Sequence, residues 1–226
     1  MKDEFVIVKL RNGLKIKLRT DSTDLQAFFN VWILQEYQRE HGFKINADDV
    51  IIDIGGHIGL FTLYCSQFCK NGKIFSFEPI RENYEILLEN IKQNDIRNVK
   101  PSNIAISSKN GKIRIYLSDD QAAHSFYKVG EKSVEIETTT LENVIQSEDI
   151  EKCNLLKLDC EGAEYEIIDS LTDDITKKIE KISLEYHHAD TKSSLLIDLK
   201  NKLKTEYLMN DHPSNNGMGI LFAKHM

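Results

Sequence analysis

The chain has 226 residues, enough for one substantial hydrophobic core and too few for two large domains. Its composition is that of an ordinary globular protein, and the net charge of −7 disfavours binding of nucleic acid or of an anionic membrane through the overall field. No apolar run approaches the roughly 20 residues of a membrane-spanning helix, and Met1–Arg11 lacks the features of a signal peptide, so we expect a cytoplasmic protein.

The first elements along the chain are a hairpin and a helix. The runs Phe5–Leu10 and Leu14–Arg19 are strand-like, and Asn12-Gly13 between them is a strong hairpin turn signal. Leu25–Glu40 then has the pattern of one continuous helix. We expect residues 1–47 to pack on the core as an N-terminal extension.

From residue 48 onward, strands and helices alternate. Val50–Ile54 is almost entirely apolar, as is typical of a parallel strand buried on both faces. Similar strands are expected at Lys73–Phe77, Val99–Ile106, Leu155–Leu158 and Lys181–Tyr186. Apolar residues at helical spacing predict helices at residues 60–68, 84–91, 164–171 and 196–203. The alternation predicts an α/β fold with a mostly parallel central sheet.

Two parts of the chain depart from this alternation. Lys112–Leu117 and Ser133–Thr138 are strand-like without an intervening helix, and we interpret them as a β excursion around the polar loop Asp119–Gly130. The segments Glu206–Met209 and Gly219–Ala223 are expected to close the chain as antiparallel strands.

The four cysteines do not suggest a metal or redox centre. Cys65, Cys69, Cys153 and Cys160 include no Cys-x-x-Cys pair, which excludes zinc-ribbon and thioredoxin motifs. Cys65 and Cys69 are one helical turn apart and could meet on a helix face. We expect all four to be buried, reduced thiols.

The clearest chemical signal is the segment Asp-Ile-Gly-Gly-His-Ile-Gly, where the first buried strand turns into a helix. A dinucleotide site requires glycines at i, i+2 and i+5, but His57 stands two residues after Gly55, so that pattern is broken. The acidic Asp53 before the turn would repel a pyrophosphate. It suits a ligand with a cationic amino group and no phosphate, such as S-adenosylmethionine.

A second carboxylate, Glu78, follows the next strand. At that position it can accept hydrogen bonds from both hydroxyls of a ribose. Each feature has a plainer alternative, because glycines also make tight strand–helix junctions and acids favour helix N-termini. Together, and in this order, the two features predict a nucleoside site.

Further motifs complete a resemblance to a known family. Beside the glycine segment and Phe-Glu-Pro, the chain contains Thr138-Thr139-Thr140-Leu141, Asn103-x-Ala105 and Asp159-Cys160-Glu161-Gly162-Ala163-Glu164. Together these resemble the FkbM family of methyltransferases over about Val50 to Tyr186. The resemblance implies a Rossmann-like class I methyltransferase fold with an antiparallel C-terminal strand, so that residues 48–226 form the methyltransferase domain. Gly56 replaces the alanine usual in the family.

The resemblance also implies a set of residues around S-adenosylmethionine. This cofactor-binding set is Tyr37, Asp53, Gly55, Gly56, His57, Gly59, Glu78, Pro79, Asn103, Ala105 and Asp159. Within it, Asp53 and the glycines are expected around the methionine part, and Glu78 on the ribose. Asn103 and Ala105 are expected beside the adenine, and Asp159 facing the methyl group.

The acceptor side is implied by the same motifs. Asp159 is the first candidate for the base that orients or deprotonates an acceptor hydroxyl; His187 or His188, and Glu185, are the next candidates. Glu161, Glu164, Glu185 and one of these histidines are expected to ring the acceptor pocket. The alternative for Asp159 and Glu161 is a purely structural role, as the N-terminal cap and a first-turn acid of the helix that follows.

Two further features stay open at this stage. Asp159, Glu161, Glu185 and a histidine could hold magnesium or another divalent metal, but no ligand-spacing rule supports this. His124-Ser125 in the polar loop could contact the acceptor, although a solvated loop is the plainer interpretation.

The resemblance to the FkbM family implies methyl transfer to a hydroxyl of a sugar, glycan or glycosylated small molecule. No nucleic-acid partner and no membrane span are expected, and the oligomeric state cannot be read. An NAD-dependent oxidoreductase and a non-catalytic cofactor-binding module are the alternatives. The missing third glycine counts against the first of these.

Overall fold

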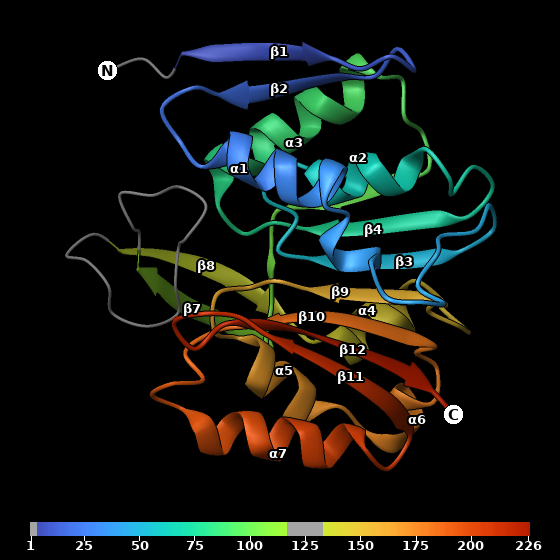
Figure 1. Ribbon diagram of the computed structural model, residues 1–226, viewed down its shortest axis with the longest axis vertical. Helices are drawn as coiled ribbons and strands as arrows, with labels where there is room; N and C mark the ends of the chain where they lie inside the picture. Colours follow the sequence, from blue (N-terminus) through green and yellow to red (C-terminus); the bar gives the residue numbers. More distant parts are fainter. Residues whose placement is uncertain (1–3, 117–132) are drawn as a thin grey trace.

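The structure is a computed structural model and describes residues 4–116 and 133–226. The strands of its main sheet lie in the order β11-β12-β10-β9-β3-β4-β5 (Figure 1). The parallel strands are β3 (Val50–Ile54), β4 (Lys73–Phe77), β5 (Val99–Ser102), β9 (Leu155–Leu158) and β10 (Lys181–Tyr186). The strand β12 (Gly219–His225) runs antiparallel to β10 and to β11 (Tyr207–Pro213). The predicted fold class is confirmed.

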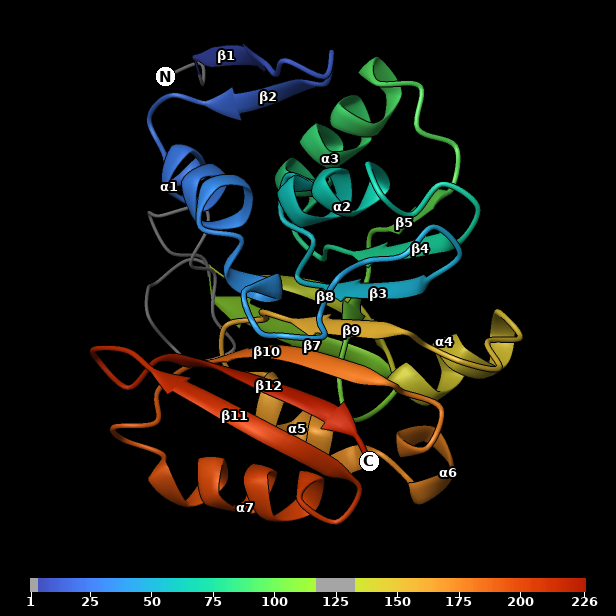
Figure 2. The ribbon, with the colours of Figure 1, turned by 45° about the vertical axis from the view of Figure 1, so that its right-hand side comes forward.

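Helices cover both faces of this sheet (Figures 1 and 2). One face carries α2 (Leu60–Ser66) and α3 (Arg81–Gln93). The helices of the other face are α4 (Leu141–Ser147), α5 (Glu164–Ser170), α6 (Asp173–Thr176) and α7 (Ser193–Leu203). On β3, Ile51 belongs to the core of the first face, and Ile52 and Ile54 to the core of the second. This two-sided burial explains why β3 is apolar at successive positions.

The N-terminal hairpin forms as predicted. The strands β1 (Phe5–Lys9) and β2 (Lys15–Arg19) pair antiparallel, and Gly13 in the turn has a φ of 91°. Ile16 and Leu18 are fully buried in the core on the α2 side. The hairpin is therefore anchored to the domain by hydrophobic packing.

The prediction of one continuous helix over residues 25–40 is wrong. The segment divides into α1 (Asp24–Phe28), the π-helical turn η1 (Phe29–Ile33) and the 3₁₀ turn η2 (Glu36–Gln38). Gln35 between the turns has a left-handed backbone, with a φ of 50°. This break brings the Tyr37 ring onto the Phe61 ring, with the centroids 5.4 Å apart. Tertiary packing thus overrides helical periodicity here.

The predicted strand over residues 99–106 is also wrong as a single element, because it divides into two. After β5, the short strand β6 (Ala105–Ile106) leaves the main sheet and pairs with β8 (Ser133–Thr139), which also pairs with β7 (Gly111–Tyr116). The β excursion is therefore a separate three-stranded sheet. The predicted loop 119–130, with His124-Ser125, lies outside the described residues.

Two short helices escaped prediction, and each has a threonine cap. The side chain of Thr140 accepts a hydrogen bond from the backbone N–H of Asn143 at the start of α4, and Thr172 accepts one from Ile175 at the start of α6. The cysteines are free thiols, of which Cys160 is half-buried and the other three are buried. In the parts of the chain that the structure describes, none of the helices is long and apolar enough to cross a membrane.

Candidate active site

Two adjoining cavities lie beyond the carboxyl ends of the parallel strands. About 750 Å³ of space free of protein atoms lies in and around the first and about 910 Å³ in and around the second, open solvent included. The first has mainly apolar walls, supplied by Ile54, Phe77, Pro79, Ile80, Ala105, Ile106 and Ile115, with the carboxylate of Glu78 among them. The second is lined by charged and polar groups, among them Glu36, Tyr37, Lys157, Glu185 and His187. Both cavities are lined by Ala27, Gly55, His57, Asp159 and Glu161, so they meet there.

The glycine turn is required by close packing of the strands. A Cβ atom on Gly55, whose φ is 80°, would lie 1.7 Å from the carbonyl oxygen of Asp159. A Cβ atom on Gly56 would lie 2.4 Å from Ser76 Oγ. Gly59 has a φ of 90° and closes the turn ahead of α2. Gly55 and Gly56 thus line the second cavity because nothing larger fits there.

The N–H groups of this turn are already engaged within the protein. Gly55 and Gly56 both donate to the carbonyl oxygen of Phe77, at 3.0 and 2.9 Å. The N–H of His57 donates to Glu78 Oε2 at 2.8 Å. A dinucleotide fold offers such N–H groups to a pyrophosphate. Their engagement here, beside a carboxylate, is incompatible with that use.

Asp53 lies under the turn and lines neither cavity. Its side chain is fully buried, with Oδ1 3.1 Å from Lys157 Nζ and Oδ2 accepting a hydrogen bond from Thr62 Oγ1 at 2.7 Å. Any action of Asp53 on a ligand therefore passes through Lys157 and the turn.

Glu78 faces the first cavity from the end of β4. Its carboxylate accepts hydrogen bonds from the backbone N–H groups of His57 and Ile80, both at 2.8 Å. Burial raises its pKa to about 7. Asn103 lies behind it and lines neither of the two cavities, because its side-chain amide donates to the carbonyl oxygens of Glu78 and Pro79. Asn103 thereby fixes the loop that carries Glu78.

His57 connects the site to the N-terminal extension. Its Nε2 lies 2.9 Å from Arg19 Nη2, and Arg19 is in turn paired with the buried Asp24. Because arginine is a permanent donor, Nε2 must accept, and the ring is neutral with its hydrogen on Nδ1. Burial lowers the pKa of His57 to about 4, in agreement with this assignment. The sequence analysis missed Arg19 and Asp24.

Tyr37 links two acids in the second cavity. Its hydroxyl oxygen lies 2.8 Å from Asp159 Oδ2 and 2.8 Å from Glu185 Oε2. A phenol has one hydrogen, so both contacts are hydrogen bonds only if one carboxyl group is protonated. Burial raises the pKa of Glu185 to about 7. Burial also opposes ionisation of Asp159, but Lys157 and His187 outweigh it and hold the pKa of Asp159 below its usual value. The proton therefore belongs to Glu185.

Two charged residues of this cavity were missed from the sequence. Lys157 is 3% exposed on β9, donates to the carbonyl oxygen of Gly55 at 2.7 Å and lies 3.8 Å from Asp159 Oδ2. A lysine inside the apolar run Leu-Leu-Lys-Leu was the available signal. Glu36, on the turn η2, also lines the cavity, and burial raises its pKa to about 8.

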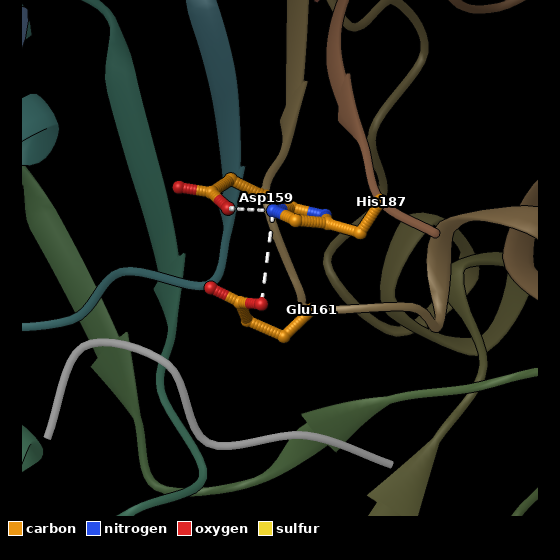
Figure 3. A group of neighbouring side chains, drawn as sticks. All are labelled: Asp159, Glu161 and His187. Carbon is orange, nitrogen blue, oxygen red and sulfur yellow. Dashed lines mark ion pairs between the residues drawn. The ribbon is translucent and has the colours of Figure 1, made fainter. Parts of the chain in front are cut away.

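His187, rather than His188, faces the site. His187 is 4% exposed and lines the second cavity, whereas His188 lines neither cavity. The Nδ1 atom of His187 lies 2.5 Å from Glu164 Oε1, and Glu164 is fully buried. Figure 3 shows the other side of the ring directed at Asp159 and Glu161.

The second cavity carries more acids than cations. Its acids are Glu36, Asp159, Glu161 and Glu185, and its cations are Lys157 and His187. Burial raises the pKa of Glu36 and of Glu161 to about 8 and that of Glu185 to about 7, so these carboxyl groups tend to hold protons near neutral pH until a positively charged group lies beside them. Of the predicted acids, Asp159 and Glu161 line both cavities, whereas Asp53, which was expected beside the ligand, lines neither.

The sheet order and the position of the site define a class I methyltransferase fold. The FkbM methyltransferase domain matches residues 53–206, and the chain therefore belongs to the FkbM methyltransferase family. Among its relatives, the hexuronic acid methyltransferase AglP of Haloferax volcanii is 27% identical over 190 residues, which cover 80% of this chain and 77% of that protein. The 31-O-demethyl-FK506 methyltransferase FkbM of Streptomyces tacrolimicus is 21% identical, with 84% and 85% covered.

Solved structures agree with this fold. The methyltransferase FkbM from Methylobacillus flagellatus has a TM-score of 0.59 at 16% identity. It matches 83% of this chain, which spans about half of that longer chain, 47%. TYW2 of M. jannaschii in complex with AdoMet has a TM-score of 0.51 at 16% identity and is matched over 100% of this chain and 89% of its own.

Proposed function

We propose that the protein is an S-adenosylmethionine-dependent O-methyltransferase that acts on a hydroxyl of a sugar, glycan or glycosylated small molecule. The observation that supports this most is the pair of cavities that meet at Asp159. The first has mainly apolar walls with Glu78 among them, the second also holds Glu36, Glu185, Lys157 and His187, and the two share Asp159 and Glu161. A nucleoside fits the first, and a cationic amino-acid portion fits the second.

The residues of the first cavity suit an adenosine. The Glu78 carboxylate can accept hydrogen bonds from the ribose hydroxyls, and Ile80, Ala105 and Ile106 offer apolar surface to the adenine. The methionine portion would lie along Gly55 and toward Tyr37. When bound, S-adenosylmethionine supplies the methyl group.

The residues of the second cavity position and deprotonate the acceptor in this proposal. Tyr37 holds Oδ2 of Asp159, which leaves Oδ1 for an acceptor hydroxyl. We assign Asp159 as the first candidate for the base, with His187 and Glu185 beside it. The walls of the cavity would align the hydroxyl for an in-line displacement.

The acceptor class follows from chemistry and relatives together. A cavity with many hydrogen-bonding groups suits a polyhydroxylated acceptor. The relative named a hexuronic acid methyltransferase supports a sugar. The engaged N–H groups of the glycine turn count against the alternative of an NAD-dependent oxidoreductase.

The test is methyl transfer in vitro. The protein is incubated with S-adenosylmethionine and a panel of sugars and uronic acids, and mass spectrometry detects the gain of one methyl group. Asp159→Asn should keep the binding of S-adenosylhomocysteine and lose turnover. A wild-type protein that binds S-adenosylhomocysteine but methylates no hydroxyl would support the non-catalytic module instead.

A further inference from the structure

One ring nitrogen of His187 lies among carboxylates without forming a hydrogen bond. Its Nε2 is 3.7 Å from Glu161 Oε2, 3.9 Å from Asp159 Oδ1 and 3.9 Å from Glu185 Oε1. These distances exceed the hydrogen-bond range of roughly 2.7–3.2 Å. In Figure 3, the side chains of Asp159 and Glu161, which follow β9, point toward this nitrogen at the end of β10. The nitrogen and the oxygens therefore surround a shared position.

The spacing of these atoms matches a ligand shell. Donor atoms that bind one divalent cation at roughly 2.1–2.5 Å lie about 3–5 Å from one another. The ligand atoms of Asp159, Glu161 and His187 all lie within 4.8 Å of one another. Two carboxylates and an imidazole form a mixed oxygen and nitrogen set.

A residue outside this set fixes the imidazole in the orientation of a ligand. The Glu164 carboxylate is fully buried, lies 2.5 Å from His187 Nδ1 and also accepts a hydrogen bond from the N–H of Gly162. The contact with Glu164 leaves Nε2, on the opposite side of the ring, directed at Asp159 and Glu161, where a bound cation would take the place of the Nε2 hydrogen. Carboxylate–histidine pairs of this kind orient metal-binding histidines.

The backbone supports the same arrangement. Glu161 has a φ of 54° and Gly162 a φ of 108°. A left-handed glutamate is strained, and such strain concentrates at functional sites. This conformation turns the Glu161 side chain into the place where the two cavities meet.

We propose that Asp159, Glu161 and His187 bind one divalent cation, Mn²⁺ or Mg²⁺, beside the acceptor. The inference rests on the proposed function, because the cation would serve to hold acceptor oxygens. A cation at this position attracts neighbouring hydroxyl and carboxylate oxygens, as in a uronic acid.

The test is a titration of the full chain with Mn²⁺, followed by electron paramagnetic resonance in the presence of S-adenosylhomocysteine. We expect one bound Mn²⁺ per chain. Glu161→Gln should weaken binding about tenfold or more, and Glu164→Gln by roughly 10–100-fold through the imidazole. The matched control is the substitution Glu166→Gln on α5. Glu166 is exposed and accepts a hydrogen bond from Ser107, so the variant protein should bind Mn²⁺ as tightly as the wild type does.

Thermal unfolding checks that each variant is folded. If Glu164→Gln does not fold, the Mn²⁺ affinity of Glu161→Gln alone decides the test. A wild-type protein without bound Mn²⁺, or equal affinities of Glu161→Gln and Glu166→Gln, overturns the cation site. S-adenosylhomocysteine binding is measured separately with a chelator present. Its retention without Mn²⁺ binding rejects the cation site alone, whereas its absence in the wild type rejects the proposed function.

Discussion

Lys157 and Asp53 form a buried ion pair beneath the glycine turn, with Nζ 3.1 Å from Oδ1. The two side chains are 3% and 0% exposed. Lys157 also donates to the carbonyl oxygen of Gly55, and Thr62 donates to Asp53. The pair thus ties β9 to β3 at the edge of the sheet that holds both cavities.

Removing the cation of this pair should destabilise the protein strongly. Lys157→Met leaves the Asp53 carboxylate buried without its partner, and we expect the free energy of unfolding to fall by about 3–5 kcal/mol. Asp53→Asn in the same chain should restore part of the loss. Urea denaturation of the single and double variants measures both effects. A loss below about 1 kcal/mol, the scale of an exposed pair, would contradict the structural role.

His57 should make stability depend on pH. Its pKa is lowered from 6.5 to about 4 by burial, with Arg19, Asp24, Asp159 and Lys157 as its charged neighbours. Between these values the unfolded chain binds a proton that the folded chain does not. The contribution of His57 to stability should therefore fall as the pH decreases through this window, by up to about 3 kcal/mol, while the buried acids with raised pKa values contribute in the opposite direction.

The control for this pH dependence is His57→Asn, since asparagine tolerates the left-handed φ of 49° at this position. Between pH 7 and pH 4, the free energy of unfolding of the wild type should fall relative to that of the variant. Equal slopes would mean that His57 is already protonated in the folded state.

Glu78 should make cofactor binding depend on pH near neutrality. Its pKa is raised to about 7 by burial, so the carboxylate is mostly protonated below this value and ionised above it. Ribose hydroxyls need the ionised acceptor. Calorimetry should find S-adenosylhomocysteine binding about tenfold tighter at pH 8 than at pH 6.

The matched variant Glu78→Gln should bind weakly at both pH values. If it keeps the wild-type affinity at pH 8, Glu78 does not hold the ribose.

The hydroxyl of Tyr37 should matter for turnover more than for the fold. Tyr37→Phe keeps the ring against Phe61 and removes the bridge between Asp159 and Glu185. We expect kcat to fall roughly 10–100-fold, the cost of losing a hydrogen bond to a charged group. The control Tyr64→Phe, in the same core cluster, should leave kcat unchanged. An unchanged kcat in Tyr37→Phe would remove the bridge from the mechanism.

Much of the fold is readable from local sequence because buried parallel strands are mostly apolar, here with one charged residue each, Asp53 in β3 and Lys157 in β9. Val50–Ile54 and Leu155–Leu158 show this pattern, and both form strands of the main sheet. The helix break at Gln35 could not be read locally, because the turn that follows it is held by a hydrogen bond from Tyr37 to Asp159, 122 positions away.

As with the fold, the sequence predicts which residues lie near the site but not how they pair across distant elements. Motif positions predict the acids near the cavities, yet Asp53 lies buried on Lys157 while Asp159 lines both cavities. Asn103 supports a loop through two carbonyl oxygens. The pairing of Arg19 with His57 joins residues 38 positions apart. Such contacts depend on how distant elements pack, which residue patterns do not encode.

A crystal structure with S-adenosylhomocysteine tests the central claim most directly. The account predicts the ribose hydroxyls within hydrogen-bond distance of Glu78, the adenine between Ile80 and Ala105, and the sulfur facing Asp159. A nucleoside bound outside the first cavity, or a diphosphate of NADH held on the N–H groups of the glycine turn, would contradict it.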